Sequence, residues 1–222
     1  MGYRFEGNVF ACEASGVVIV LNLRTNRYAA LPKTLADTLL ALRDGKPHVH
    51  MQTQLEALCK AGVLTETYGN DFLWPTPDVN VPLSSILDGS LLRVGLFDLC
   101  EATARRLFSI VRFKCQPLHR TIEHIQRRKL DYAGRSRRHC VSLSAKHLAA
   151  FLDTRFLVPT QDRCLPWSIA CLDAFAHRCA DLTLVIGVRS DPFGAHAWVQ
   201  QADMVLTDEL DRVLLYTPIL AV

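Results

Sequence analysis

The segment FGAHAWVQQADMVLTDE, residues 193–209, places titratable side chains inside two short apolar runs. Alternation in AHAWVQ predicts a half-buried strand, and a tight turn near residues 201–203 leads to a second predicted strand, DMVLTDE. His196 begins the first strand and Asp208 closes the second. A histidine on such a strand is more often a satisfied core residue than a catalytic one. The choice between the two depends on a nucleophile elsewhere in the chain.

A candidate nucleophile, Cys164, lies just before the predicted helix RCLPWSIACLDAFAHRCA, whose first turn contains Pro166. The free N–H groups and the dipole at a helix start lower the pKa of a thiol there. The resulting thiolate attacks acyl groups, and the same N–H groups can receive an oxyanion. Cys171 and Cys179 fall later in the helix, so we interpret them as packing residues.

The order Cys164, His196, Asp208 therefore predicts a catalytic triad on a helix start and two neighbouring strands. His196 would take the thiol proton, and Asp208 would orient the imidazole. A strand-end aspartate can also be a simple cap or turn residue. The combined layout is that of papain-like and transglutaminase-like cysteine enzymes.

The strings CLPWSIACLDAFAHRCA, LVIGV (184–188) and PFGAHAWV (192–199), followed by Asp208, resemble the leader peptidase of lasso-peptide biosynthesis. This family of transglutaminase-like cysteine proteases removes the leader from a ribosomally made precursor, and a separate ATP-using cyclase then closes the macrolactam. The resemblance implies the catalytic residues Cys164, His196 and Asp208 and partners in the precursor peptide and the cyclase. Gln200 departs from the glutamate more often expected there, which bears on substrate preference.

The first 68 residues predict three strands (8–14, 17–23 and 27–31) and two helices whose stop signals are Gly45 and Gly62. This order suggests a small winged-helix module, and it resembles the leader-recognition domain shared by many peptide-modifying systems. The resemblance implies that the leader adds as a strand to the third strand and packs on the last helix. The implied leader-binding residues are Arg27, Tyr28, Ala29, Leu55, Leu58 and Cys59.

Three prolines in residues 69–85 interrupt regular structure and predict a domain seam. We expect a recognition domain over 1–78 and a peptidase domain over 85–222. Residues 85–160 have helical spacing of apolar residues, and one helix with antiparallel strands follows. The predicted fold class is α+β, with a small winged-helix-like N-terminal domain, a helical segment and a transglutaminase- or papain-like core.

Half of the 222 residues are hydrophobic, which is typical of a globular protein. The longest apolar run, residues 16–23, is too short to span a bilayer, and the first residues lack the features of a signal peptide, so we expect a cytoplasmic protein. Eight cysteines include no C-x-x-C pair, and we expect free thiols, no metal site and no cofactor.

Residues 101–140 carry eleven Lys and Arg against three acidic residues, a net charge of +8, whereas the whole chain has +3. This excess suits a DNA-binding winged-helix regulator, but the candidate recognition helix offers only Lys60 as a cation, so we expect no nucleic-acid partner. The basic segment is instead a candidate contact with the cyclase through Arg135, Arg137 and Arg138.

Two alternatives keep the same fold. A transglutaminase or amidase acting on another amide also passes through a thioester, and an inactive scaffold would only deliver peptide to the cyclase. The intact triad disfavours the scaffold. Gln161, three residues before Cys164, is a candidate for the second oxyanion donor.

Overall fold

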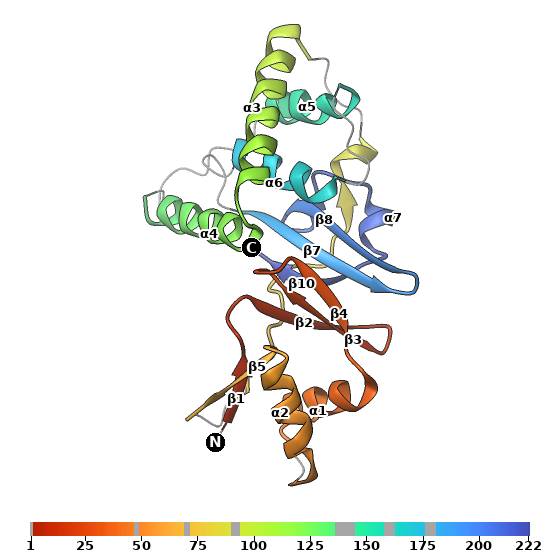
Figure 1. The fold of residues 1–222 in the computed structure, drawn as a ribbon. Helices are drawn as coiled ribbons and strands as arrows, with labels where there is room; N and C mark the ends of the chain where they lie inside the picture. Colours follow the sequence, from red (N-terminus) through yellow and green to blue (C-terminus); the bar gives the residue numbers. More distant parts are fainter. Residues whose placement is uncertain are drawn as a thin grey trace. The chain divides into compact units, whose positions relative to one another are not determined.

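The computed structural model describes residues 2–46, 49–68, 72–89, 94–135, 145–157, 163–175 and 181–222 (Figure 1). The chain divides into two compact units. The first contains residues 1–77 with 188–194 and 217–220, and the second contains 78–187, 195–216 and 221–222. The predicted seam and the roles assigned to residues 1–78 and 85–222 stay predictions.

The first unit begins with β1 (Gly2–Phe5), β2 (Val9–Ala14), β3 (Val17–Asn22) and β4 (Arg27–Ala30). Helices α1 (Lys33–Arg43) and α2 (Gln52–Lys60), joined through a 3-10 turn at Val49–Met51, lead to β5 (Leu64–Thr67). Strands β2, β3 and β4 form an antiparallel sheet in that order, and β1 pairs with β5. The predicted strands and helices of this half are present, whereas β1 was not predicted.

Local chemistry explains the turns of this unit. Ser15 and Gly16 both have positive φ (48° and 79°), as a two-residue hairpin between β2 and β3 requires. Gly45 and Gly62 have φ of 66° and 68° just after the two helices, where glycine ends a helix without strain. Both helices pack on one face of the sheet through a shared core that includes Val18, Leu39 and Leu58 (Figure 1).

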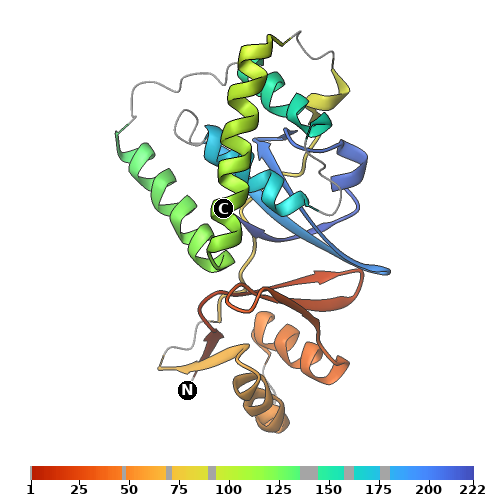
Figure 2. The ribbon, with the colours of Figure 1, turned by 45° about the horizontal axis from the view of Figure 1, so that its top comes forward.

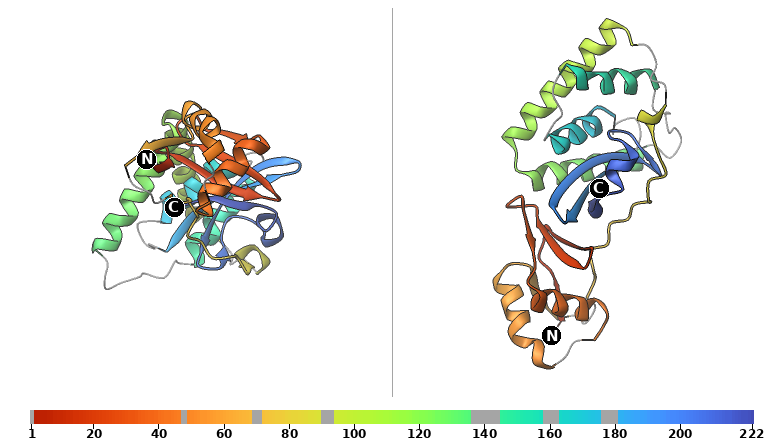
Figure 3. Two further views of the ribbon diagram at one scale, coloured as in Figure 1. Left: turned by 90° about the horizontal axis from the view of Figure 1, so that it is seen from below. Right: turned by 90° about the vertical axis from the view of Figure 1, so that its right-hand side faces the viewer.

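Helices and one mixed sheet make up the second unit, apart from residues 188–194 and 217–220 of that sheet, which are counted with the first unit. Its helices are α3 (Leu96–Cys115), α4 (Leu118–Arg135), α5 (Ala145–Asp153), α6 (Cys164–Phe175) and α7 (Leu210–Val213), with 3-10 turns at Ile86–Asp88 and Thr154–Phe156. The strand order is β10 (Thr217–Ala221), β7 (Leu182–Ser190), β8 (Phe193–Gln201), β9 (Met204–Val205) and β6 (Ser84–Ser85). Helix α6 lies between the sheet and the α3–α5 pair (Figures 2 and 3).

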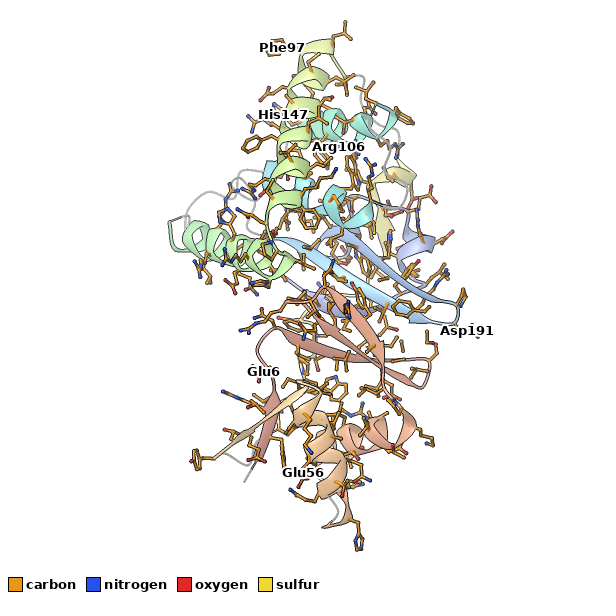
Figure 4. All side chains as sticks on the ribbon, viewed as in Figure 1. Glu6, Glu56, Phe97, Arg106, His147 and Asp191 are labelled. Atoms are coloured by element: carbon orange, nitrogen blue, oxygen red, sulfur yellow. The ribbon has the colours of Figure 1, made fainter. Side chains whose placement is uncertain are left out.

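Buried polar contacts hold α6 against its neighbouring helices. Asp173 on α6 accepts a 2.8 Å hydrogen bond from Ser109 and pairs with Arg112 at 2.8 Å and Arg128 at 3.4 Å. Arg106, labelled in Figure 4, is 1% exposed and donates to the backbone oxygen of Thr154 at 2.7 Å. Its guanidinium lies 4.2 Å from the ring centre of Trp167, so this buried cation is stabilised by a hydrogen bond and an aromatic face.

The α+β fold class is confirmed, with N-terminal strands, then helices and a sheet-rich C-terminal core. Three details differ from the prediction. The predicted loop at 189–194 is largely strand, the second predicted strand ends at Val205 so that Asp208 lies in a bend beyond it, and β10 was not predicted. His196 is 4% exposed because residues on both faces of β8 are buried, so the strand is not half-buried.

Gln200 is a structural residue of the second unit. Its side-chain oxygen accepts from Trp198 Nε1 at 2.8 Å, and its Nε2 donates to the backbone oxygens of Asn80 (2.9 Å) and Ala202 (2.7 Å). A glutamate carboxylate has no N–H to donate to these two carbonyls. The glutamine at this position therefore stabilises the β8–β9 turn, which corrects its interpretation as a residue of substrate preference.

Candidate active site

Cys164 is the first residue of α6, a position that its neighbours leave open to a ligand. The backbone N–H of Trp167 donates to the oxygen of Arg163, which makes Arg163 the last residue before the helix. The first N–H groups of a helix have no partner inside it, and Pro166 has no N–H at all. The N–H of Leu165 hydrogen-bonds the Cys164 sulfur, so the N–H of Cys164 is the donor available to a ligand at this helix start.

His196 connects Cys164 to Asp208. Its Nε2 lies 2.6 Å from Oδ2 of Asp208, and its ring also hydrogen-bonds with the Cys164 thiol. Because Nε2 faces the carboxylate, Nδ1 is the nitrogen that faces the sulfur. The structure thus brings the three residues predicted from the sequence into one chain of hydrogen bonds.

Three contacts fix the segments that carry the triad. Ser168, one turn after Cys164, donates to the backbone oxygen of Ala197 at 3.0 Å and joins α6 to β8. Trp167 Nε1 donates to the backbone oxygen of Thr207 at 3.2 Å, and Ser85 donates to that of Asp208 at 2.7 Å. These bonds hold the bend at Asp208, which is not a strand end, at hydrogen-bond distance from the His196 ring.

The electrostatics favour a thiolate–imidazolium pair. Burial raises the pKa of Cys164, but hydrogen bonds from His196 and from the N–H groups of Ala197 and Leu165 outweigh it, and the pKa falls below its usual 9.0. Burial lowers the pKa of His196, but the hydrogen bonds to Asp208 and Cys164 raise it to about 9. By contrast, burial raises the pKa of Cys171 well above its usual value, which leaves that thiol protonated.

Asp208 stays ionised in this arrangement. Burial raises its pKa, but His196 and the N–H of Glu209, which donates to Oδ1 at 2.9 Å, lower it below the usual 3.8. Arg212 Nη1 lies 3.9 Å from the same oxygen. An ionised carboxylate at Nε2 keeps the imidazole in the orientation that a general base needs.

Two aromatic rings pack near the His196 ring, and the missing side chain of Gly187 leaves space for them. The ring centres of Trp198 and Tyr216 lie 6.3 Å and 5.1 Å from that of His196. A Cβ atom on Gly187 would lie 2.9 Å from both the Trp198 ring and Cβ of Tyr216. Gly187, part of the quoted LVIGV string, is therefore required by close packing, and the sequence alone did not indicate that role.

The triad opens onto a cleft of about 720 Å³ within the second unit. Such a volume is ordinary for a site that binds a small ligand or a few residues of a peptide. Other side chains on the cleft were not predicted as site residues; they are Leu87, Arg155, Trp167, Ala195, Thr207, Glu209, Arg212 and Tyr216. Of the site residues that were not predicted, Ser168 is the one that the sequence could have indicated, because it is a polar residue four positions after Cys164 on the same helix face.

The predicted leader-binding residues divide into two groups. Arg27, Tyr28 and Ala29 lie on β4, at one edge of the three-stranded sheet. Leu55 and Leu58 are 6% and 0% exposed and belong to the core, and Cys59 packs against it. The structure therefore corrects the prediction that a bound leader contacts Leu58 directly, because the Leu58 side chain is already covered by the sheet and α1.

Some predicted residues fall outside this description. Gln161, Arg137, Arg138 and Cys179 lie outside the described residues, as does the side chain of Arg135. Of the residues that are described, no group of three or more His, Cys, Asp or Glu side chains is placed to hold a metal ion. No helix in the described ranges has the length and apolar character to cross a membrane.

The sequence model of the transglutaminase-like superfamily matches residues 108–221, just over half of the chain. The chain belongs to the transglutaminase-like superfamily. No curated protein and no solved structure matches it.

Membership of this superfamily defines the type of chemistry. Transglutaminase-like proteins are typically Cys-His-Asp enzymes, with activity of the cysteine protease or acyltransferase type. The residues from Cys164 to Asp208 all fall within the matched region. The superfamily and the geometry thus point to the same cleft.

We predict that iodoacetamide at pH 6 alkylates Cys164 in preference to the exposed Cys100 and Cys115. An unperturbed thiol is under about 1% thiolate at that pH, whereas the thiolate of Cys164 forms as pH rises through its lowered pKa, and His196 remains charged up to about pH 9. Mass spectrometry of labelled peptides measures the rates. His196→Ala should slow Cys164 about tenfold or more without slowing Cys100, and equal rates at all three thiols would contradict the ion pair.

Gly187→Ala should reduce both stability and the reactivity of Cys164. The added methyl group forces Trp198 or Tyr216 to move, which costs about 1–3 kcal/mol and displaces the imidazole that they back. Urea denaturation and iodoacetamide labelling measure the two effects. Gly89→Ala is the matched control, because its Cβ would meet only the oxygen of Ile86 at 3.7 Å. Equal behaviour of the two variants would rule out the packing argument.

Proposed function

We propose that this chain is a cysteine endopeptidase that removes the leader from a ribosomally made lasso-peptide precursor. The observation that carries the proposal is the hydrogen-bonded Cys164, His196 and Asp208 at the mouth of one cleft. The resemblance of residues 164–208 to lasso-peptide leader peptidases supports the substrate class. A separate ATP-using cyclase is the expected partner, and a cytoplasmic location suits both.

The proposed reaction begins with attack of the Cys164 thiolate on the carbonyl carbon that joins leader to core. The new S–C bond forms as the C=O electrons move to oxygen, where the N–H of Cys164 and one further donor hold the oxyanion. His196 then gives its proton to the departing amine of the core, and a thioester to the leader remains. Water, deprotonated by His196, hydrolyses that thioester and restores the thiol.

The first unit suits recognition of an extended leader at β4, which is an edge strand of its three-stranded sheet. The N–H of Leu31 donates to the oxygen of Val18, and Ala29 stands opposite Val20. Hydrogen-bonded pairs alternate along an antiparallel ladder, so the backbone N–H and C=O of Ala29 point toward β3, whereas those of Ala30 point away from it. Those outward groups can pair with an added strand.

A second candidate function is acyl transfer to an amine or the hydrolysis of another amide, because the same thioester serves all three reactions. The specific observation that favours a peptide substrate is the β4 edge, which has strand geometry and outward backbone groups. A DNA-binding regulator has less support, since α2 presents Glu56 and a single cation, Lys60.

We expect Cys164→Ala to abolish leader removal while leader binding persists. The purified protein is incubated with its precursor, and mass spectrometry detects two products whose masses sum to precursor plus one water. Binding is measured by fluorescence anisotropy of a labelled leader. Cys171→Ala is the matched control, because that thiol is buried and protonated. Products formed by Cys164→Ala would contradict the nucleophile, and exchange of a product amine for added amine would favour acyl transfer.

Ala30→Pro should weaken leader binding about tenfold with little change in stability. Proline removes the outward N–H but no bond to β3, and edge strands tolerate proline in that orientation. Anisotropy measures affinity and urea denaturation measures stability. Ala29→Pro, which removes a bond to β3, should instead destabilise the sheet. Unchanged affinity in Ala30→Pro would exclude strand addition at β4.

A further inference from the structure

An arginine with no ion-pair partner among the described residues lines the candidate catalytic cleft. Arg155 lies on the 3-10 turn after α5, is partly exposed, and shares the cleft with Cys164 and His196. Its guanidinium stacks over the neighbouring Phe156 ring at 4.8 Å. Among the described residues, no Asp or Glu side chain forms a salt bridge with it.

Three other described arginines of this unit have partners, whereas Arg163, which directly precedes Cys164, does not line the cleft. Arg106 is bonded to Thr154, Arg112 is paired with Asp173, and Arg212 lies 3.9 Å from Asp208. Glu209 also lines the cleft but does not pair with Arg155. Among the described residues, Arg155 is thus a cation on the cleft that forms no ion pair with an acidic side chain.

A guanidinium in this position has a preferred class of ligand. Its N–H groups match the two oxygens of a carboxylate, and it sheds water more readily than an ammonium group does. Within the triad, the charges of Cys164 and His196 balance one another, and Asp208 is bonded to His196. Of the two described arginines that line the cleft, Arg212 lies near Asp208, so Arg155 is the one left to bind an incoming anion.

We propose that Arg155 forms a subsite for a carboxylate of the substrate, supplied by an Asp or Glu side chain close to the scissile bond. The proposal rests on the proposed function, since it assumes that a peptide occupies the cleft for attack by Cys164. It makes Arg155 a specificity residue, which acts on substrate choice without a role in proton transfer. Neutral peptides should be poorer substrates than peptides with an acidic residue there.

The test requires no precursor peptide. Four alkylating reagents label the full chain at pH 6: iodoacetamide, iodoacetate, N-iodoacetyl-glycine and N-iodoacetyl-glycinamide. In each case the thiolate sulfur bonds to the CH₂ carbon and iodide leaves with the electron pair. The two acids carry a carboxylate at different distances from the sulfur, and each amide is its neutral counterpart. The measured quantity is the acid-to-amide rate ratio at Cys164.

We expect Arg155→Gln to lower this ratio about fivefold or more for at least one acid, as loss of a charged hydrogen bond predicts, and Arg155→Lys to lower it less. Arg163→Gln is the matched control, because Arg163 precedes Cys164 and carries the same charge but does not line the cleft. The proposal would be overturned if the acid-to-amide rate ratio is unchanged in Arg155→Gln, or if it falls equally in Arg163→Gln. Failure of all four reagents to label wild-type Cys164 would instead refute the proposed function.

Discussion

The 2.6 Å contact between His196 and Asp208 is the constraint on which the active-site structure depends. Burial works against the charged form of every member of the triad, because it raises the pKa of Cys164 and Asp208 and lowers that of His196. Their mutual hydrogen bonds, together with those from the N–H groups of Ala197, Leu165 and Glu209, reverse these effects. The catalytic charges therefore exist together or not at all, and small displacements of any one residue affect the other two.

This requirement explains why the surrounding contacts are polar and short. Cys164, His196 and Asp208 come from a helix start, a strand and a bend. Bonds from Ser168, Trp167 and Ser85 to backbone oxygens fix these three segments without adding charge to the site. The ion pairs of Asp173 with Arg112 and Arg128, and the contacts of Arg106, then hold α6 against the neighbouring helices.

The cleft combines a fixed catalytic group with a free cation. In the proposed function, attack and proton transfer involve the triad, whereas Arg155 contributes only charge and hydrogen-bond donors. In the proposed function, the edge of β4 binds the leader over its length, and the cleft selects the bond to be cut. Separate binding of leader and cleavage site lets a short recognition sequence direct cleavage of varied core peptides.

The sequence by itself placed Cys164 at a helix start and predicted most of the elements. A cysteine before Pro166 at a helix start, the alternation around His196 and the glycine stops at Gly45 and Gly62 are local signals, and local backbone preferences decide them. The sequence also predicted the order of Cys164, His196 and Asp208, which the structure brings into hydrogen-bond contact.

Tertiary structure alone decided the features that depend on contacts between distant segments. The bend at Asp208 replaces a predicted strand because Trp167 and Ser85 bind its backbone, and Leu58 is core because α2 packs on the sheet. The roles of Gln200 and Gly187 likewise depend on Asn80, Trp198 and Tyr216. Periodicity reports which face of an element is apolar, but it carries no information about which distant group that face or side chain meets.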